Sequence, residues 1–300
     1  MEDIYVIGHK SPDTDSVASA IVYAGIKGYK AAVSGIVNPE TAFALAKFGV
    51  AAPEVLTNVE GKKLVLVDHN ELAQMVDGGD KAEILEIIDH HKMTVSLAKP
   101  IAIRVEPTGS TATLIAKIYP DEVKANPTWA GLLLSAILSD TVIFKSPTTT
   151  EEDRNTAVIL ASLCGITDVM AYGIEMKKAN SSIVGKNIAD VIGADFKDFD
   201  MNGKKVGIGQ TELVDMSEIS ARRDEIVARL NELKTEGYEM VIYSATDIIN
   251  EGSEVFFVGD KTVIEKAFGI ATETDNSVYV KGLMSRKKQI VPPLEEAYKS

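Results

Sequence analysis

Three short apolar runs in the first half of the chain each end in histidine and aspartate. The runs are IYVIG (4–8), LVLVDH (64–69) and EILEIIDHH (83–91). They have the length of buried strands, and amphipathic segments of helical length alternate with them, such as residues 15–29 with Val17, Ile21 and Ala24 on one face. This alternation predicts a parallel, doubly wound sheet, whose strands end at one common edge.

Helical patterns precede a change of pattern in the last third of the chain. They cover residues 110–119, 128–141 and 151–179, and the second of these is apolar nearly all round and therefore buried. From about residue 193 four strand-like runs surround one clear helical pattern at residues 219–237. We therefore expect an α/β fold: an N-terminal domain with a doubly wound, mainly parallel sheet over residues 1–185, then a smaller α+β domain over residues 193–300.

Charge and composition narrow the classes of function. A net charge of −13 disfavours extended binding of nucleic acid, although a local cationic pocket could still hold a small anion. No apolar run is long enough to cross a bilayer, and the first residues lack the pattern of a signal peptide. A single cysteine, Cys164, excludes disulfides and cysteine-based zinc sites. We expect a cytoplasmic protein without a membrane or nucleic-acid partner.

Every histidine of the chain lies where a predicted strand gives way to a loop. Aspartates accompany them, and the set comprises His9, Asp13, Asp15, Asp68, His69, Asp89, His90 and His91. One such motif alone is more typical of a turn or a helix cap, but three converging motifs favour a metal centre. Pro12 places the first motif in a loop before a helix. A capping role there remains an alternative for either Asp13 or Asp15.

The DHH run and one further acidic residue, Asp140, add to this argument. In the DHH run, adjacent histidines of an extended backbone point to opposite sides, so one can face a metal and the other a substrate. Asp89 is placed to orient one of these histidines. Asp140 follows the apolar run GLLLSAILS, where a carboxylate is costly unless it is paired or binds a metal. A capping or ion-pairing role for Asp140 remains open.

Four motifs taken together resemble those of a known superfamily. They are GHKSPDTDS (8–16), VDHN (67–70), DHH (89–91) and LSDT (138–141). The set resembles the DHH phosphoesterase superfamily and, within it, the family II inorganic pyrophosphatases. Residues 283–294 (LMSRKKQIVPPL) are similar to that family's substrate-binding signature, and residues 195–199 (DFKDF) to its lysine motif. Related exopolyphosphatases, exonucleases and small-nucleotide phosphodiesterases carry a histidine-containing motif in the C-terminal domain, whereas this chain has no histidine after His91.

The resemblance implies a role for each matching residue. His9 and Asp13 would hold one divalent ion, Asp15, His90 and Asp140 a second, and Asp68 would bridge the two. Phosphates would be bound by His91, Lys197, Arg286 and Lys287. Among these residues, the reaction would depend most directly on Asp13, Asp68 and His91. The roles of Asn70 and Lys288 stay open.

The implied activity is hydrolysis of pyrophosphate to two phosphates by a water or hydroxide held between two metals. Four aspartates offset two divalent ions, and the three cations Lys197, Arg286 and Lys287 offset most of the substrate's charge. The resemblance implies two Mn²⁺ or Co²⁺ per subunit, further Mg²⁺ with the substrate, a homodimer, and a cleft that closes across a linker at residues 180–193. The alternatives are another DHH phosphoesterase, such as an exopolyphosphatase or a small-nucleotide phosphodiesterase, and a catalytically silent phosphate- or metal-binding protein.

Overall fold

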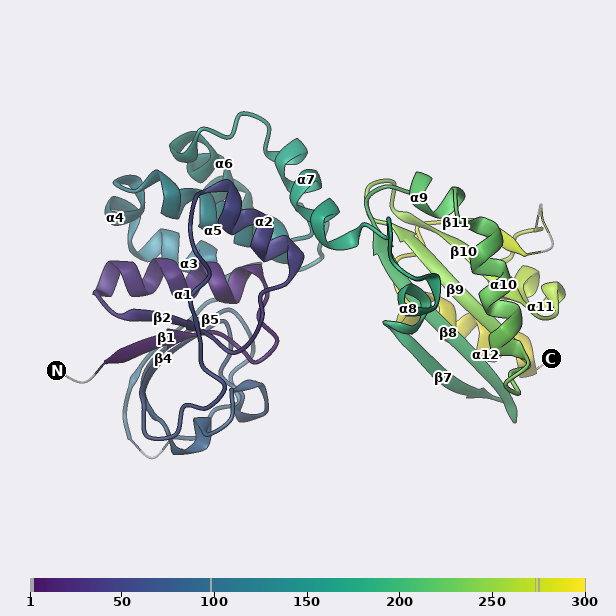
Figure 1. The fold of residues 1–300 in the computed structure, drawn as a ribbon, viewed down its shortest axis with the longest axis horizontal. Coiled ribbons are helices and arrows are strands. Elements are labelled where there is room, and N and C mark those ends of the chain that lie inside the picture. The colour runs from purple at the N-terminus through teal and green to yellow at the C-terminus, as the bar shows by residue number, and fades with distance from the viewer. Residues whose placement is uncertain (1–2, 98, 273, 275, 300) are drawn as a thin grey trace. The chain divides into compact units, whose positions relative to one another are not determined.

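The computed structural model of the protein describes residues 3–97, 99–272, 274 and 276–299, except for the side chain of Lys287. The chain forms two compact units, Met1–Asn180 and Ser181–Ser300. The fold confirms the predicted succession of a parallel α/β domain and a smaller α+β domain (Figure 1).

The first unit contains a six-stranded sheet in the order β3-β2-β1-β4-β5-β6, and every neighbouring pair of strands is parallel. The strands are β1 (Ile4–Ile7), β2 (Lys30–Val33), β3 (Glu54–Val55), β4 (Lys63–Val67), β5 (Glu83–Asp89) and β6 (Ala102–Val105). The strand order reverses between β1 and β4. In open α/β sheets, ligands bind at such a reversal, beyond the carboxyl ends of the strands.

Helices and short 3₁₀ turns connect these strands, and further helices follow β6. They are α1 (Thr14–Lys27), α2 (Pro39–Lys47), η1 (Leu72–Gln74), η2 (Gly79–Lys81), α3 (Thr111–Ile118), α4 (Pro120–Lys124), α5 (Pro127–Asp140), α6 (Glu151–Cys164) and α7 (Val169–Ser181). Helices α1, α3 and α5 lie on one side of the sheet and bury a large apolar core (Figure 1). The run Ala130–Ser139 in α5 is wholly buried, as its uniform apolar composition predicts.

The second unit has a five-stranded sheet in the order β11-β10-β9-β8-β7, in which only β8 and β9 are parallel. Its strands are β7 (Phe196–Met201), β8 (Lys204–Leu213), β9 (Met240–Asp247), β10 (Gly252–Val258) and β11 (Ser277–Lys281). Its helices are α8 (Ile188–Gly193), α9 (Ser217–Ser220), α10 (Arg223–Lys234), α11 (Lys261–Phe268), the π-helical turn η3 (Arg286–Ile290) and α12 (Val291–Lys299).

Two details of the second unit differ from the sequence pattern. The single helix expected over residues 219–237 is interrupted at Arg222, whose guanidinium donates to the carbonyls of Ile183 and Lys186. Residues 180–193 are expected as a linker, but from Ser181 onward they belong to this unit, and Val191 and Ile192 are buried in the same apolar cluster as strand β9.

No single helix in the described parts of the chain is long and apolar enough to cross a membrane. Helices α6 and α7 pass the same test of length and composition only as a pair joined across a bend of 90°.

Candidate metal centre

The loop after β1 brings His9 and Asp13 together. Asp13 is the N-cap of α1: its Oδ1 accepts the Ser16 N–H at 2.9 Å, and its own N–H donates to the Ser16 hydroxyl. The other carboxylate oxygen, Oδ2, lies 3.1 Å from Nε2 of His9. The helix cap therefore uses one oxygen of Asp13 and leaves the second facing His9, so capping and metal binding are compatible.

Asp68 follows β4 and faces both groups of candidate ligands. Its backbone has a φ of 63°, a left-handed conformation that aspartate tolerates better than most residues. Oδ2 of Asp68 lies 3.5 Å from Nε2 of His9, whereas Oδ1 lies 3.3 Å from Nε2 of His90. The hydroxyl of Thr111 donates to Oδ1 at 3.0 Å. The two oxygens of this buried carboxylate thus point toward different histidines.

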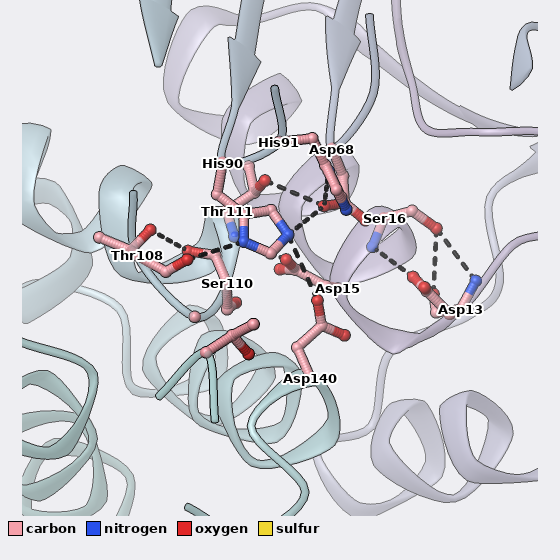
Figure 2. Close-up of polar contacts among 12 residues, drawn as sticks. Asp13, Asp15, Ser16, Asp68, His90, His91, Thr108, Ser110, Thr111 and Asp140 are labelled. Atoms are coloured by element: carbon pink, nitrogen blue, oxygen red, sulfur yellow. Dashed lines mark hydrogen bonds and ion pairs between the residues drawn. The ribbon is translucent and has the colours of Figure 1, made fainter. Parts of the chain in front are cut away.

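His90 presents one ring nitrogen to the acidic residues. Its Nδ1 lies 2.9 Å from the carbonyl oxygen of Thr108, which sets the tautomer with the proton on Nδ1. Its Nε2 faces Asp68 and, at 3.5 Å, Oδ2 of Asp140 (Figure 2). This Nε2 is buried and has no hydrogen-bond partner within the described residues. A buried, unpaired nitrogen is costly, and a metal ion beside these carboxylates would satisfy it.

The start of α3 holds Asp15, which is fully buried on α1. The backbone N–H of Thr111 donates to Oδ2 of Asp15 at 2.6 Å, and that of Ala112 to Oδ1 at 3.0 Å. Ser19 adds a hydroxyl donor to Oδ1 at 3.1 Å. These contacts fix the orientation of the carboxylate. Carboxylates that bind metals are commonly held in this way, by hydrogen bonds from groups that do not themselves contact the metal.

The candidate ligands form two groups that share Asp68. Within each group one ligand atom per residue lies within 4.8 Å of all the others. We name them the first ion position (His9, Asp13 and Asp68) and the second ion position (Asp15, Asp68, His90 and Asp140). A third group, with His91 in addition to Asp68 and His90, also meets this distance criterion. Nδ1 of His91, however, is hydrogen-bonded to Asp89.

Without metals, the crowded charges of this site displace its pKa values. Burial and the neighbouring charge of Asp68 raise the pKa of Asp15 to about 8. Burial, with the charges of Asp15 and Asp68, also raises the pKa of Asp140 well above its usual range. Burial disfavours charge on Asp68 as well, but the adjacent imidazoles of His9 and His90 outweigh it and lower the pKa of Asp68. The site favours positive charge at its centre.

The two histidines respond in the same sense. Burial opposes the charged form of His9, but its hydrogen bonds to Asp13 and Asp68 raise the pKa of His9 to about 10. Burial also opposes the charged form of His90, but the nearby carboxylates of Asp68 and Asp15 outweigh it and raise the pKa of His90 to about 9. Protons therefore supply the positive charge that metal ions could supply instead.

Asp89 and Asn70 organise the DHH loop. Oδ1 of Asp89 lies 2.8 Å from Nδ1 of His91 and accepts the backbone N–H groups of both histidines. Asn70 donates to Asp89 Oδ2 at 2.6 Å and to the Lys92 carbonyl at 2.9 Å, which gives a structural role to a residue whose role the sequence left open. Strand β5 ends at Asp89, so the histidine rings are not forced to opposite sides, and their centroids lie 4.2 Å apart.

Sequence reasoning missed the partners that hold these ligands. Thr108, Thr111 and Ala112 act through a carbonyl, a hydroxyl and backbone N–H groups. The one available signal was PTGST (107–111) immediately before a predicted helix, a pattern typical of a turn and an N-cap.

Two of the expected phosphate ligands of the second unit, Arg286 and Lys197, lie beside Asp195. The Arg286 guanidinium is largely buried and donates to the Asp195 carboxylate at 2.7 Å and to the carbonyls of Asp195 and Ile208. Lys197, on β7, is mostly exposed, with its Nζ 3.8 Å from Oδ1 of Asp195. The Lys287 side chain lies outside the described part of the chain. Lys288, an exposed residue, donates its backbone N–H to Ser285.

Comparison with known proteins gives matches along almost the whole chain. Residues 3–137 match the family model "DHH family, N-terminal domain", and residues 174–297 match "DHHA2 domain". A manganese-dependent inorganic pyrophosphatase of Methanocaldococcus jannaschii is 49% identical over 305 residues, covering 98% of this chain and 99% of that protein. One from Methanothrix thermoacetophila is 46% identical over 310 residues, covering 99% of each.

Solved structures extend the comparison. The crystal structure assigned to a family II inorganic pyrophosphatase of Methanococcus jannaschii is 48% identical, with a TM-score of 0.66 and coverage of 99% of this chain and 100% of that one. An exopolyphosphatase-related protein of Bacteroides fragilis shares only the fold, at 14% identity, a TM-score of 0.52, and coverage of 99% of this chain and 92% of that one.

Proposed function

Since this chain belongs to the family II manganese-dependent inorganic pyrophosphatases, we propose that it hydrolyses inorganic pyrophosphate to two phosphates at the two ion positions. The observation that supports this best is the pair of ligand groups that share Asp68, with an unpaired Nε2 of His90 buried between carboxylates. The chemistry of the donors agrees, because imidazole and carboxylate ligands without thiolate suit Mn²⁺ or Co²⁺.

Two divalent ions, when bound, would polarise the phosphoryl oxygens and lower the pKa of a water between them, which would supply the nucleophile. His9 and Asp13 would hold one ion, and Asp15, His90 and Asp140 the other. Asp68 would contribute one oxygen to each position, as its contacts with both histidines suggest. The four aspartates would balance the charge of the two ions, so further cations are needed for the substrate.

His91 would contact a phosphate. Its ring is half exposed, and Nδ1 is bound to Asp89, which leaves Nε2 for another partner. The hydrogen bond to Asp89 raises the pKa of His91, although partial burial opposes this. His91 would therefore hold a proton on Nε2 and donate it in a hydrogen bond to a phosphate oxygen.

Lys197, Arg286 and Lys287 would balance the remaining negative charge of pyrophosphate, with Mg²⁺ as a possible companion of the substrate. Arg286 has donors suited to a bidentate contact with phosphate. Asp195 already occupies part of this guanidinium, so a phosphate would have to exchange with that carboxylate or share the donors with it. We propose that the substrate engages both units, and that this arrangement excludes bulk water, other than the attacking water, during the reaction.

The remaining features of the proposal come from the resemblance and from composition. The protein would act as a homodimer in the cytoplasm, with neither a nucleic acid nor a membrane as a partner. The net charge of −13 supports the exclusion of nucleic acid.

The proposal is tested by a matrix of metals and substrates. Metal-free protein is supplied with Mn²⁺, Co²⁺, Mg²⁺ or Zn²⁺ and then with pyrophosphate, tripolyphosphate, a cyclic dinucleotide or a short oligonucleotide. We expect rapid phosphate release from pyrophosphate with Mn²⁺ or Co²⁺. Preference for tripolyphosphate or a nucleotide would identify another phosphoesterase. Tight Mn²⁺ binding without hydrolysis of any substrate would identify a silent binding protein.

A further inference from the structure

Asp153 is a buried carboxylate that lies outside the two groups of candidate ligands. It is the third residue of α6 and has no exposed surface. Its oxygens accept hydrogen bonds from the N–H of Gly109 at 2.8 Å, the hydroxyl of Thr113 at 2.6 Å, and the N–H and hydroxyl of Thr150, both at 2.7 Å. These donors are uncharged. Burying a carboxylate among uncharged donors costs free energy, and a cap for α6 alone does not require a carboxylate at this buried position.

Two of these contacts lead to ligands of the second ion position. Gly109 follows Thr108, whose carbonyl orients His90. Thr113 lies in the first turn of α3, and the N–H groups that begin this helix hold both oxygens of Asp15. Asp153 therefore joins the loop that orients one ligand to the helix that holds another.

The packing around Gly109 makes this connection rigid. A Cβ atom on Gly109 would lie 2.7 Å from Oδ2 of Asp153 and 2.8 Å from Cγ2 of Thr141, both too close to be accommodated without movement. Thr141 directly follows Asp140, a further ligand of the second ion position. The backbone at Gly109 is thus in contact with the segments that carry Asp153 and Asp140.

The first ion position has a different support. Asp13 is fixed by its own capping box with Ser16, and His9 lies only four residues earlier in the same loop. None of the four hydrogen bonds of Asp153 described above leads to this loop. The two positions share only Asp68, to whose Oδ1 Thr111 donates.

We propose that Asp153 is a positioning residue for the second ion position alone, and that it sets the affinity of that position independently of the first. The inference rests on the proposed function only in taking the two groups of ligands as metal sites. Outer partners of metal ligands are typically worth about 10–100-fold in affinity. Loss of Asp153 therefore weakens one bound ion by about that factor and leaves the other unchanged.

The test is a titration of metal-free protein with Mn²⁺, without substrate, followed by the electron paramagnetic resonance signal of the free ion. Wild type should bind two ions per chain. Asp153→Ala should retain one ion at the wild-type affinity and bind the other about 10–100-fold more weakly. In an Asp140→Asn background, where the second position is already impaired, Asp153→Ala should have no further effect on the remaining ion.

Two variants separate positioning from a general loss of stability. Asp153→Asn can keep an oxygen toward Gly109 and Thr150 while its amide donates to the Thr113 hydroxyl, so it should restore the weaker affinity to within about threefold of wild type. Thr150→Ala removes the cap of α6 but leaves the Gly109 and Thr113 contacts. It should lower the unfolding temperature without changing the ratio of the two affinities.

Equal weakening of both ions in Asp153→Ala, unchanged affinities in that variant, or the same selective weakening in Thr150→Ala would each overturn the inference. Because the titration needs no substrate, these outcomes are distinct from a failure of the proposed function. That failure would be a wild-type protein that binds two ions and does not hydrolyse pyrophosphate.

Discussion

The two ion positions are built in different ways. The first takes His9 and Asp13 from one loop, where a proline and a capping box fix both residues within a few positions of each other. The second takes Asp15, His90 and Asp140 from three separate segments, and backbone groups in and just before α3 orient Asp15 and His90. Local sequence can specify the first position, whereas the second depends on the packing of the whole unit.

This difference has an energetic consequence. Asp15, which is buried, and Asp140, which is partly buried, belong only to the second position and have raised pKa values, whereas one oxygen of Asp13 is used by a helix cap. Without metal, the second position destabilises the fold because its carboxyl groups lie too close together. With metal, the same crowding favours binding. Substitutions at single ligands can therefore separate the two positions.

The largest effect is expected for Asp68→Ala, which removes an oxygen from both positions. Metal ions stabilise such reactions by several kcal/mol, so turnover should fall at least about a thousandfold at 1.36 kcal/mol per factor of ten. Metal analysis of the dialysed variant should show loss of both ions. Retention of two ions with wild-type turnover would contradict the shared role of Asp68.

Asp140→Asn should act on the second position only. We expect it to keep one Mn²⁺, to weaken the other by at least about 100-fold, and to reduce turnover accordingly. In metal-free protein the same change should raise stability, by about 1–3 kcal/mol, because it removes a partly buried carboxyl group crowded by Asp15 and Asp68. Thermal unfolding with and without Mn²⁺ checks this. A variant that is less stable than wild type under both conditions would contradict the account.

Metal-free protein should lose stability as the pH rises from about 5 to 8. The pKa of Asp15 is raised to about 8 in the folded chain, and those of His9 and His90 to about 10 and 9. The fold therefore binds more protons than the unfolded chain in this range, and stability falls with pH. Saturating Mn²⁺ should remove most of this dependence, because the ions replace the protons. Denaturant unfolding at several pH values measures how the free energy of unfolding depends on pH. A free energy of unfolding that rises with pH in metal-free protein would refute the pKa directions.

The smallest effect separates the two functions of Asp13. Asp13→Asn keeps an oxygen for the Ser16 N–H, so it should weaken the first ion without loss of stability in metal-free protein. Asp13→Ala should weaken the ion similarly and also lower the free energy of unfolding by about 0.5–2 kcal/mol, the usual contribution of an N-cap. Equal metal-free stability of the two variants would show that the cap of α1 contributes little.

The same division explains how much the sequence predicted. The strand ends, the parallel sheet of the first unit and the buried helix before Asp140 follow from apolar patterns, and the structure has them close to the expected residues. The candidate ligands lie together because the carboxyl ends of β1, β4 and β5 converge at the reversal of the strand order. Residue type and strand direction were sufficient for this part.

The supporting contacts were not predictable in the same way. Thr108 acts through a backbone carbonyl, which any residue carries, and Asp153 lies in an acidic first turn that is typical of an ordinary helix start. The ion pair of Arg286 with Asp195 joins residues 91 positions apart. Such contacts depend on tertiary packing, and no local pattern distinguishes them from residues on a solvated surface.

The central claim is that one carboxylate, Asp68, serves both ion positions. A crystal structure of the Mn²⁺-bound protein, with anomalous diffraction to locate manganese, tests it most directly. We expect two anomalous peaks about 3.5–4 Å apart, both in contact with Asp68, one beside His9 and Asp13 and the other beside Asp15, His90 and Asp140. A single peak, or two peaks of which only one contacts Asp68, would contradict it.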